Sequence, residues 1–152
     1  MSIIVKIEID GKEVGKYEVD QKKSPEGLPE KPISQYAKFF DECSKYWEKD
    51  PEISLLFLKQ QEAYASALLK SRGHLFLNEV YDMLGLPQTK AGQLVGWIYD
   101  DKKPIGDNYV SFGIYNDFVG NRNFINGYER TILLDFNVDG EIFGILRDKE
   151  SE

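Results

Sequence analysis

The sequence has very few of the side chains that most often bind metals or act as nucleophiles. Its 152 residues include one cysteine, Cys43, and one histidine, His74. A single cysteine excludes an internal disulfide and agrees with a reducing compartment. We expect Cys43 to be a small buried residue on the core side of a helix. One histidine argues against a zinc site, so we expect His74 to cap or pack a helix and expect no metal or cofactor.

Long apolar runs are also missing. The stretch 55–58 is among the longest, and a membrane span needs roughly 20 such residues. The first residues, "MSIIVKIEID", bring in charge after three apolar residues and contain no small-residue cleavage site, so they do not resemble an export signal. We therefore expect a cytoplasmic protein, or one that becomes part of a particle assembled in the cytoplasm, with no membrane contact.

Basic charge is scarce relative to acidic charge. The chain has 26 acidic and 19 basic residues and a net charge of −7, so as a whole it repels phosphate backbones, and we expect no direct binding of nucleic acid. An acidic protein can also mimic nucleic acid, which requires carboxylates clustered on one face. Here the acidic residues are mixed with lysines along most of the chain, which favours an ordinary solvated surface.

The chain does contain enough apolar residues for one domain. Hydrophobic residues make up 41% and aromatic residues 13% of the sequence, and the length is that of a typical single domain. We expect one domain over 1–146, followed by a frayed tail at 147–152. Its predicted parts are a hairpin (1–21), a connecting loop (22–32), a helical part (33–85) and a sheet part (93–146).

The N-terminal part has the pattern of a β-hairpin. The segment "IIVKIEIDGKEVGKYEV" alternates apolar and polar residues on both sides of Asp10-Gly11, and Asp-Gly suits a tight hairpin turn. The inward-facing residues would be Ile3, Val5, Ile7 and Ile9. The next segment, "KKSPEGLPEK", is rich in proline and charge and is expected to be an exposed connection.

Two long helices are predicted next. The first has Ser34 as its N-cap and an apolar stripe at three- and four-residue spacing, formed by Tyr36, Phe39, Phe40, Cys43, Tyr46 and Trp47. The second starts at Asp50-Pro51, an N-cap followed by a proline that needs no hydrogen-bond acceptor. It ends at Gly73, with basic residues in its last turn.

The second helix is apolar on more than one side. Its main predicted face consists of Ile53, Leu56, Phe57, Tyr64, Ala67 and Leu68, while Leu55, Leu58 and Ala65 lie elsewhere around it. Two interpretations remain open: a central helix that is buried on several sides, or a helix with one flank against a partner.

A short third helix over 75–84 is predicted to stop at Gly85 and Pro87. Thr89 could cap one further turn. The spacing of Gly85, Gly92 and Gly96 matches neither dinucleotide-binding nor P-loop motifs, so we interpret these glycines as breaks between elements rather than as a ligand cradle.

The remaining sequence favours strands. The segments "LVGWIY", "NYVSFGIY", "ERTILLDFNV" and "EIFGIL" are rich in β-branched and aromatic residues, and Asp139-Gly140 repeats the hairpin signal. We therefore expect an α+β fold with an N-terminal β-hairpin, two long helices, a short third helix and a C-terminal antiparallel sheet of undetermined strand order.

Part of the sequence resembles a known family. The run "LLKSRGHLFLNEVYDMLGLPQTKAGQLVGW", followed by "GDNYVSFGI" and "ILLDFNVDG", resembles a domain of unknown function found in phages and prophages of Gram-positive bacteria. The similarity extends from the end of the second helix to Gly140, about half of the chain. Its motif positions are Phe76, Leu77, Asn78, Tyr81, Asp82, Leu84, Gly85, Leu86, Thr89, Gly92, Gly96 and Trp97.

This resemblance implies a mobile-element context, either in the host bacterial cytoplasm or within a phage particle. It implies no activity, because the family has no established catalytic residues. Members often carry an apolar, membrane-like segment ahead of the domain, whereas this sequence has the hairpin pattern there. That departure argues against a membrane-associated role.

We expect a protein-binding module related to virion structure or assembly, because exposed aromatic residues give large contact areas at small entropic cost. It could bind another phage protein or a second copy of itself. The alternative is a small acidic inhibitor of a bacterial defence nuclease. The expected partner surface consists of Tyr99, Asp100, Asp101, Asp107, Tyr109, Tyr115, Phe118 and Phe124.

Catalysis is the least favoured interpretation. A pair of carboxylates could carry out acid–base chemistry or hold magnesium, and Asn78 and Asp82 would share one helix face. No pair, however, is accompanied by a nucleophile or base in a recognisable arrangement, so we expect no enzyme; a carboxylate-dependent hydrolase remains the third possibility. The candidate carboxylates are Asp82, Asp100, Asp101, Asp107, Asp117 and Asp135.

Overall fold

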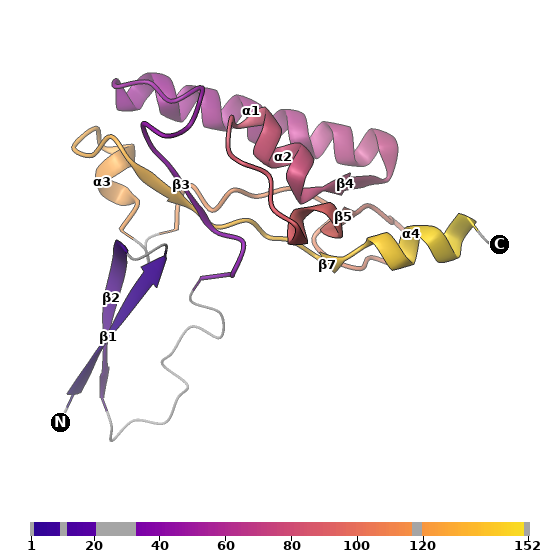
Figure 1. Cartoon of the computed structure of the whole chain (residues 1–152), viewed down its shortest axis with the longest axis horizontal. Coiled ribbons are helices and arrows are strands. Elements are labelled where there is room, and N and C mark those ends of the chain that lie inside the picture. The colour runs from indigo at the N-terminus through magenta and orange to yellow at the C-terminus, as the bar shows by residue number, and fades with distance from the viewer. Residues whose placement is uncertain (1, 10–11, 21–32, 117–119, 151–152) are drawn as a thin grey trace.

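The computed structural model describes residues 2–9, 12–20, 33–116 and 120–150. It combines α-helices with short antiparallel sheets, as an α+β fold requires (Figure 1). The elements in chain order are β1 (Ser2–Ile9), β2 (Lys12–Asp20), β3 (Lys38–Phe40), α1 (Pro51–Arg72), β4 (His74–Phe76), α2 (Leu77–Met83), the 3₁₀ turn η2 (Ala91–Gln93), β5 (Val95–Ile98), α3 (Arg122–Ile125), β6 (Ile132–Leu134), β7 (Gly140–Glu141) and α4 (Phe143–Glu150).

The predicted N-terminal hairpin is confirmed. β1 pairs antiparallel with β2, from Ser2 opposite Asp20 to Ile9 opposite Lys12, with an irregularity after Ile7. The Asp10-Gly11 turn and the connection at 21–32 lie outside the described residues, and so do the side chains that we expected to face inward.

The second predicted helix is confirmed at both ends as α1. The Asp50 carboxylate accepts a hydrogen bond from the backbone N–H of Glu52 at 2.9 Å, which satisfies one of the N–H groups that a helix start leaves without a partner. At the other end Gly73 adopts a φ of 87° and donates its N–H to the carbonyl of Leu69. Local capping chemistry therefore determines both ends of α1.

The buried face of α1 is not the predicted one. Its core side is formed by Ser54, Leu58, Ala65 and Leu69. Four residues of the predicted face, Ile53, Leu56, Tyr64 and Ala67, are exposed instead. α1 lies along one side of the molecule rather than at its centre (Figure 1). Because apolar residues surround much of this helix, periodicity alone could not select the face that is covered.

The first predicted helix is wrong. Where a helix was expected, β3 pairs antiparallel with β6, so that Lys38 lies opposite Leu134 and Phe40 opposite Ile132. Ser34 accepts the N–H of Tyr36, two residues ahead, instead of capping a helix. The spacing of the aromatic residues fits a helix, but long-range pairing with β6 makes 38–40 a strand, and the residues that follow form turns.

The predicted C-terminal sheet is only partly confirmed. One sheet has the order β4-β5-β7 and a second pairs β3 with β6, and all pairs are antiparallel. Both sheets therefore draw on strands from the expected helical part. His74, expected to begin a helix, lies in β4. The segment 141–146, expected as a strand, mostly belongs to α4, whose 143–150 stretch contains good helix formers.

Asp139-Gly140 also differs from its prediction as a hairpin turn. Gly140 lies opposite Gly96 in the β5-β7 pair, and Asp139 donates its backbone N–H to the carbonyl of Gly96 at 2.9 Å. Asp139-Gly140 therefore lies where the chain begins to pair with the edge of β5, and it does not form a turn between two consecutive strands.

An aromatic cluster forms the centre of the core. Trp97 and Phe112 are fully buried, and Phe136 packs edge-on against both Phe112 and Tyr81, at centroid distances of 5.5 and 5.7 Å. Leu58 of α1 joins the same cluster. The helix and the C-terminal extended segments thus share one apolar core, and they bring the segments 34–36, 105–107 and 135–140 together on its surface.

Candidate functional site

The segments 34–36, 105–107 and 135–140 surround a cleft of about 700 Å³. Two hydrogen bonds hold its walls together: the N–H of Ser34 donates to Asp135 Oδ1 at 3.2 Å, and Asn137 Nδ2 donates to Asp107 Oδ2 at 3.0 Å. The cleft therefore unites parts of the chain about a hundred residues apart, and we call it the acidic cleft for Asp107, Asp135 and Asp139.

Asn137 is the central positioning residue of the cleft. Its Oδ1 accepts the indole N–H of Trp97 at 2.9 Å and the backbone N–H of Ser111 at 2.6 Å. Its Nδ2 donates to Asp107 and also to the carbonyl of Tyr109 at 3.0 Å. The side-chain amide of Asn137 thus uses both its N–H donors and its oxygen acceptor, and it connects the buried Trp97 to the exposed loop.

Asp139 lies at the end of the cleft beside β5. Its Oδ2 accepts the backbone N–H of Ile98 at 2.9 Å. Partial burial raises the pKa of this carboxyl above its ordinary value, the Ile98 hydrogen bond opposes the shift, and the negative charge of Asp107 adds to it. A side chain at Gly106 would collide with the Asp139 carboxylate, so glycine permits this close approach.

The other wall of the cleft is tied to the core through tyrosine. The buried Tyr81 donates its hydroxyl proton to the carbonyl of Tyr36 at 2.7 Å. Burial raises the pKa of Tyr81 far above its usual range, and the nearby Tyr36 adds to this shift. Tyr81 therefore remains neutral and acts as a fixed donor that holds the wall formed by Tyr36.

Chemically, the cleft combines carboxylates with apolar surface from Tyr36, Phe136 and Val138. This combination suits a polypeptide segment that presents a lysine or arginine next to apolar atoms. Among the residues that the structure describes, no three His, Cys, Asp or Glu side chains are grouped to hold a metal ion.

The predicted partner surface is only partly exposed. Tyr109 and Tyr115 are more than half exposed, and Asp101 and Asp107 also face solvent. Tyr99 and Asp100 are partly buried, and Phe118 lies outside the described residues. Phe124, by contrast, is 1% exposed. Its place on the predicted surface is wrong, because α3 turns this side chain into the core.

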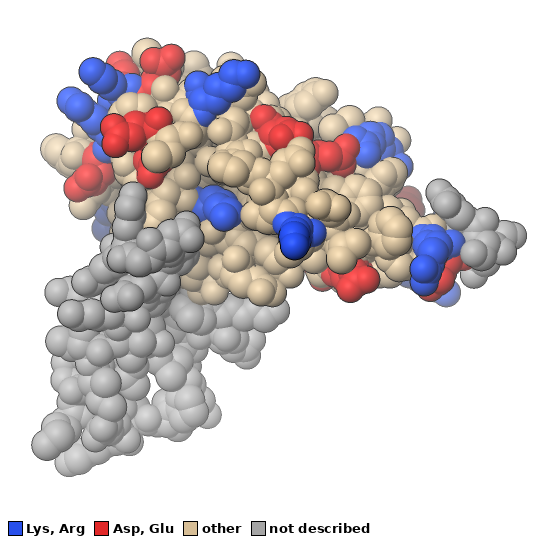
Figure 2. Space-filling model, viewed as in Figure 1, with Lys and Arg blue, Asp and Glu red and all other residues tan. Residues whose placement is uncertain are grey.

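The loop that carries these residues has a defined internal structure. Asp100 and Asn108 exchange hydrogen bonds at 3.1 Å, with the Asn108 side chain bonding both backbone groups of Asp100. The Asp100 carboxylate accepts the N–H groups of Lys102 and Lys103, each at 3.0 Å. This loop mixes acidic and basic residues, and Figure 2 shows the same mixing over the part of this face that is coloured by charge.

The candidate catalytic carboxylates are dispersed. Asp107 and Asp135 meet in the cleft, but Asp82 is exposed and accepts from Gln88 at 2.7 Å, and Asp101 is exposed in the loop. Asp117 lies outside the described residues. Asn78 does not share an exposed face with Asp82, since it is buried and bonds both backbone groups of Thr89 at 2.9 Å.

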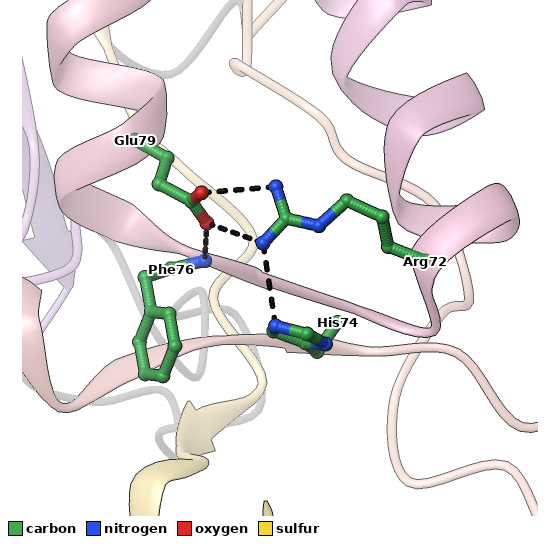
Figure 3. Close-up of polar contacts among 4 residues, drawn as sticks. All are labelled: Arg72, His74, Phe76 and Glu79. Carbon is green, nitrogen blue, oxygen red and sulfur yellow. Dashed lines mark hydrogen bonds and ion pairs between the residues drawn. The ribbon is translucent and has the colours of Figure 1, made fainter.

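Cys43 occupies a different environment from the one expected, whereas His74 packs against a neighbour as expected, but within a strand. Cys43 is exposed, because its segment forms turns after β3 instead of an amphipathic helix. His74 packs edge-on against Phe76 and accepts from Arg72 Nη2 at Nε2, over 3.3 Å (Figure 3). Arg72 also pairs with Glu79 at 2.9 and 3.3 Å. This group joins the end of α1 to the start of α2.

The glycines at 92 and 96 have packing roles. A side chain at Gly92 would overlap the Asn78 amide, and one at Gly96 would overlap the backbone of β4 at Leu75. The Gly92 N–H donates to Thr89 Oγ1 at 3.0 Å, although the residue at the N-cap of η2 is Lys90 and not Thr89. Gly92 lies inside η2 and Gly96 inside β5, so these two glycines permit close packing within elements and are not breaks between them.

The sequence interpretation missed Asn137 and Asp139 as members of the site. A usable signal was present, because polar residues at 135, 137 and 139 alternate with Phe136 and Val138. In an extended segment such alternation places the polar groups on one face.

Comparison with known proteins gives one match, to a family of unknown function, DUF6353, and this match covers residues 4–146. The chain belongs to this family. The match extends over nearly the whole chain, whereas the sequence resemblance was placed in its C-terminal half. No curated protein and no solved structure matches the chain. Among the described residues, no helix has both the length and the apolar character that crossing a bilayer requires.

Proposed function

We propose that the protein is a non-enzymatic protein-binding module of a phage or prophage programme, which binds its partner through the acidic cleft. The single observation that carries this proposal is a cleft of about 700 Å³ whose lining combines three carboxylates with apolar side chains. Its partner would be an extended polypeptide segment with a lysine or arginine, contributed by a virion or assembly protein. The resemblance to phage and prophage domains supports this setting.

The contacts of the carboxylates favour binding over catalysis. Asp135, Asp139 and Asp107 each accept a hydrogen bond from the protein itself, from Ser34, Ile98 and Asn137 respectively. Such bonds hold a carboxylate in one orientation and suit a fixed receptor for a cation. The exposed Ile105 and Tyr109 beside the cleft would extend the contact area.

The test is affinity purification of the tagged full chain from infected or lysogenic cells in moderate salt. Asp107→Lys places a positive charge in the cleft and should weaken capture of the partner at least about tenfold, through repulsion of its basic residue. Asp101→Lys makes the same charge change on the same loop outside the cleft, and should leave capture unchanged.

Other outcomes would contradict the proposal. The defence-inhibitor alternative would be favoured if Asp101→Lys and Asp107→Lys weakened capture equally and the captured partner were a basic host nuclease in a salt-sensitive complex. In that alternative the partner binds the whole acidic loop. Recovery of a chemically converted small molecule would favour a hydrolase. Capture that is indifferent to Asp107→Lys and to Ile105→Glu would remove the cleft as the binding site.

A further inference from the structure

The outward side of α1 carries an apolar stripe that no described part of the chain covers. Ile53, Leu56 and Tyr64 are 53%, 58% and 58% exposed. At 100° per residue they share one side of the helix with Gln60, Ala63 and Ala67, which are also exposed. We call these six residues the α1 stripe. Such a stripe on the longest helix marks a contact surface.

The α1 stripe is uneven along its length, and this unevenness indicates its occupant. Its N-terminal half carries Ile53 and Leu56, whereas its C-terminal half carries Tyr64 between the small Ala63 and Ala67. If two copies of α1 pack antiparallel about a two-fold axis near Gln60, Ile53 of each copy lies against the small Ala67 of the other copy, and Leu56 lies against Tyr64. Helices pack by this fitting of ridges into grooves.

Charge at the two ends of α1 has the same complementarity. Glu52 is exposed in the first turn and Lys70 is exposed in the last turn, and both project to the same side of the stripe. The two-fold axis brings Glu52 of each copy near Lys70 of the other. A parallel pair would instead place both Glu52 side chains at one end and both Lys70 side chains at the other, so that no opposite charges would face each other.

Two exposed tyrosines widen the contact surface. Tyr46 packs against Phe57 at a centroid distance of 5.7 Å, and Lys59 Nζ lies 5.3 Å from the ring centroid of Tyr115. These rings therefore flank α1 on opposite sides. The contact of Lys59 with Tyr115 also holds its ammonium group to one side of the stripe, away from the Lys59 of the second copy.

We propose that the chain forms a two-fold symmetric homodimer through antiparallel packing of α1 against α1. The helix is about 33 Å long for its 22 residues. A standard interface needs about 800 Å² from each partner, more than a single helix stripe supplies without the flanking tyrosines. The dimer is therefore of moderate affinity. It is independent of the acidic cleft, which leaves its lining residues free in both copies.

Sedimentation velocity of the full chain over a concentration series tests the dimer. The wild type dimerises, and Leu56→Glu weakens dimerisation at least about tenfold by placing a charge at the contact. Phe143→Glu introduces the same charge at an exposed apolar site on α4 and leaves the dimer unchanged. Circular dichroism of each variant confirms that folding is retained. A wild type that stays monomeric throughout the series would overturn the proposal.

Cross-linking tests the antiparallel orientation. In a Cys43→Ser background, Gln60→Cys places the two thiols near the two-fold axis and gives a disulfide-linked dimer under mild oxidation. Ser71→Cys, on the same side of α1, separates the thiols by roughly 33 Å, since each lies 11 residues from the axis at about 1.5 Å per residue, and gives no cross-link. Efficient cross-linking of Ser71→Cys, or none of Gln60→Cys, would contradict the antiparallel pair.

A charge exchange provides a third measurement. Glu52→Lys and Lys70→Glu each weaken the dimer in low salt, and the double variant restores it, because opposite charges again face each other. Failure of the double variant to recover would contradict the proposed register.

Discussion

Two extended segments in the same core satisfy their backbone groups in different ways. β5 pairs with the backbone of β4 on one side and of β7 on the other. In the segment 110–113, by contrast, side chains take the N–H groups: Ser66 Oγ accepts from Val110 at 2.9 Å, Asn137 Oδ1 from Ser111 at 2.6 Å, and Glu62 Oε2 from Phe112 at 2.8 Å.

This difference shows that a strand-like burial pattern does not require a regular sheet. Val110, Phe112 and Ile114 are buried in alternation with more exposed neighbours, as the sequence predicted for a strand. Backbone N–H groups in a core need partners, and here α1 and the 135–140 segment supply them from side chains. The N–H groups of residues 110–112 therefore depend on individual polar side chains, whereas β5 depends mainly on its neighbours' backbone, with the Ile98 N–H, which donates to Asp139, as an exception.

The largest expected effect is at β5. Trp97→Ala removes a fully buried indole and should lower the free energy of unfolding by about 3–5 kcal/mol, as measured by urea denaturation. Tyr128→Ala, at the 81% exposed Tyr128, is the control and should change stability by less than about 0.5 kcal/mol. A loss below about 1 kcal/mol for Trp97→Ala would mean that β5 is not the stable centre of the core.

A smaller effect, with a distinct local signature, is expected at Asn137. Asn137→Ala leaves the N–H groups of Trp97 and Ser111 without their acceptor, and should cost roughly 2–4 kcal/mol. Hydrogen exchange should accelerate more at the Ser111 amide than at the β5 amides, because only the former relies on this side chain. The exposed Asn123→Ala serves as the control. If hydrogen exchange accelerated equally in both segments, the proposal that only the 110–113 segment relies on the Asn137 side chain would be wrong.

The smallest effect concerns pH. The folded-state pKa of Asp139 is raised above 3.8, mainly by burial, so ionisation of this carboxyl disfavours the folded state. Its contribution to stability falls as pH rises from 3.8 through the folded-state pKa and is constant above it. Asp139→Asn keeps an acceptor for the Ile98 N–H and cannot ionise.

The stability of Asp139→Asn relative to wild type should therefore be greater at neutral pH than near pH 3.8. The change should stay under about 1 kcal/mol, because solvent screens a partly exposed group. Urea unfolding at both pH values measures it. A relative stability that rises as the solution is acidified would show that the Ile98 hydrogen bond outweighs burial.

Local chemistry explains which elements could be predicted. Both ends of α1 could be predicted because Asp50, Pro51 and Gly73 act within one turn of its ends. The paired hairpin strands followed from alternation around Asp10-Gly11. The 34–47 segment could not be predicted in this way, since its aromatic spacing fits a helix, and only pairing with the distant β6 makes 38–40 a strand.

The candidate site depends still more on distant contacts. Asp107 was recognised as part of a surface loop, but nothing local indicated that Ser34 and Asp139 would meet beside it. Phe124 was misplaced for the same reason, because an aromatic residue in a polar loop can face either way.

The sequence by itself determined the elements whose start, end or turn is set by neighbouring residues, because capping and turn chemistry act over a few positions. Only the tertiary structure decided which face of α1 is buried, which strand pairs with β3, and which carboxylates share the cleft. Those choices depend on free energies of packing and hydrogen bonding between residues that the chain brings together only when it folds.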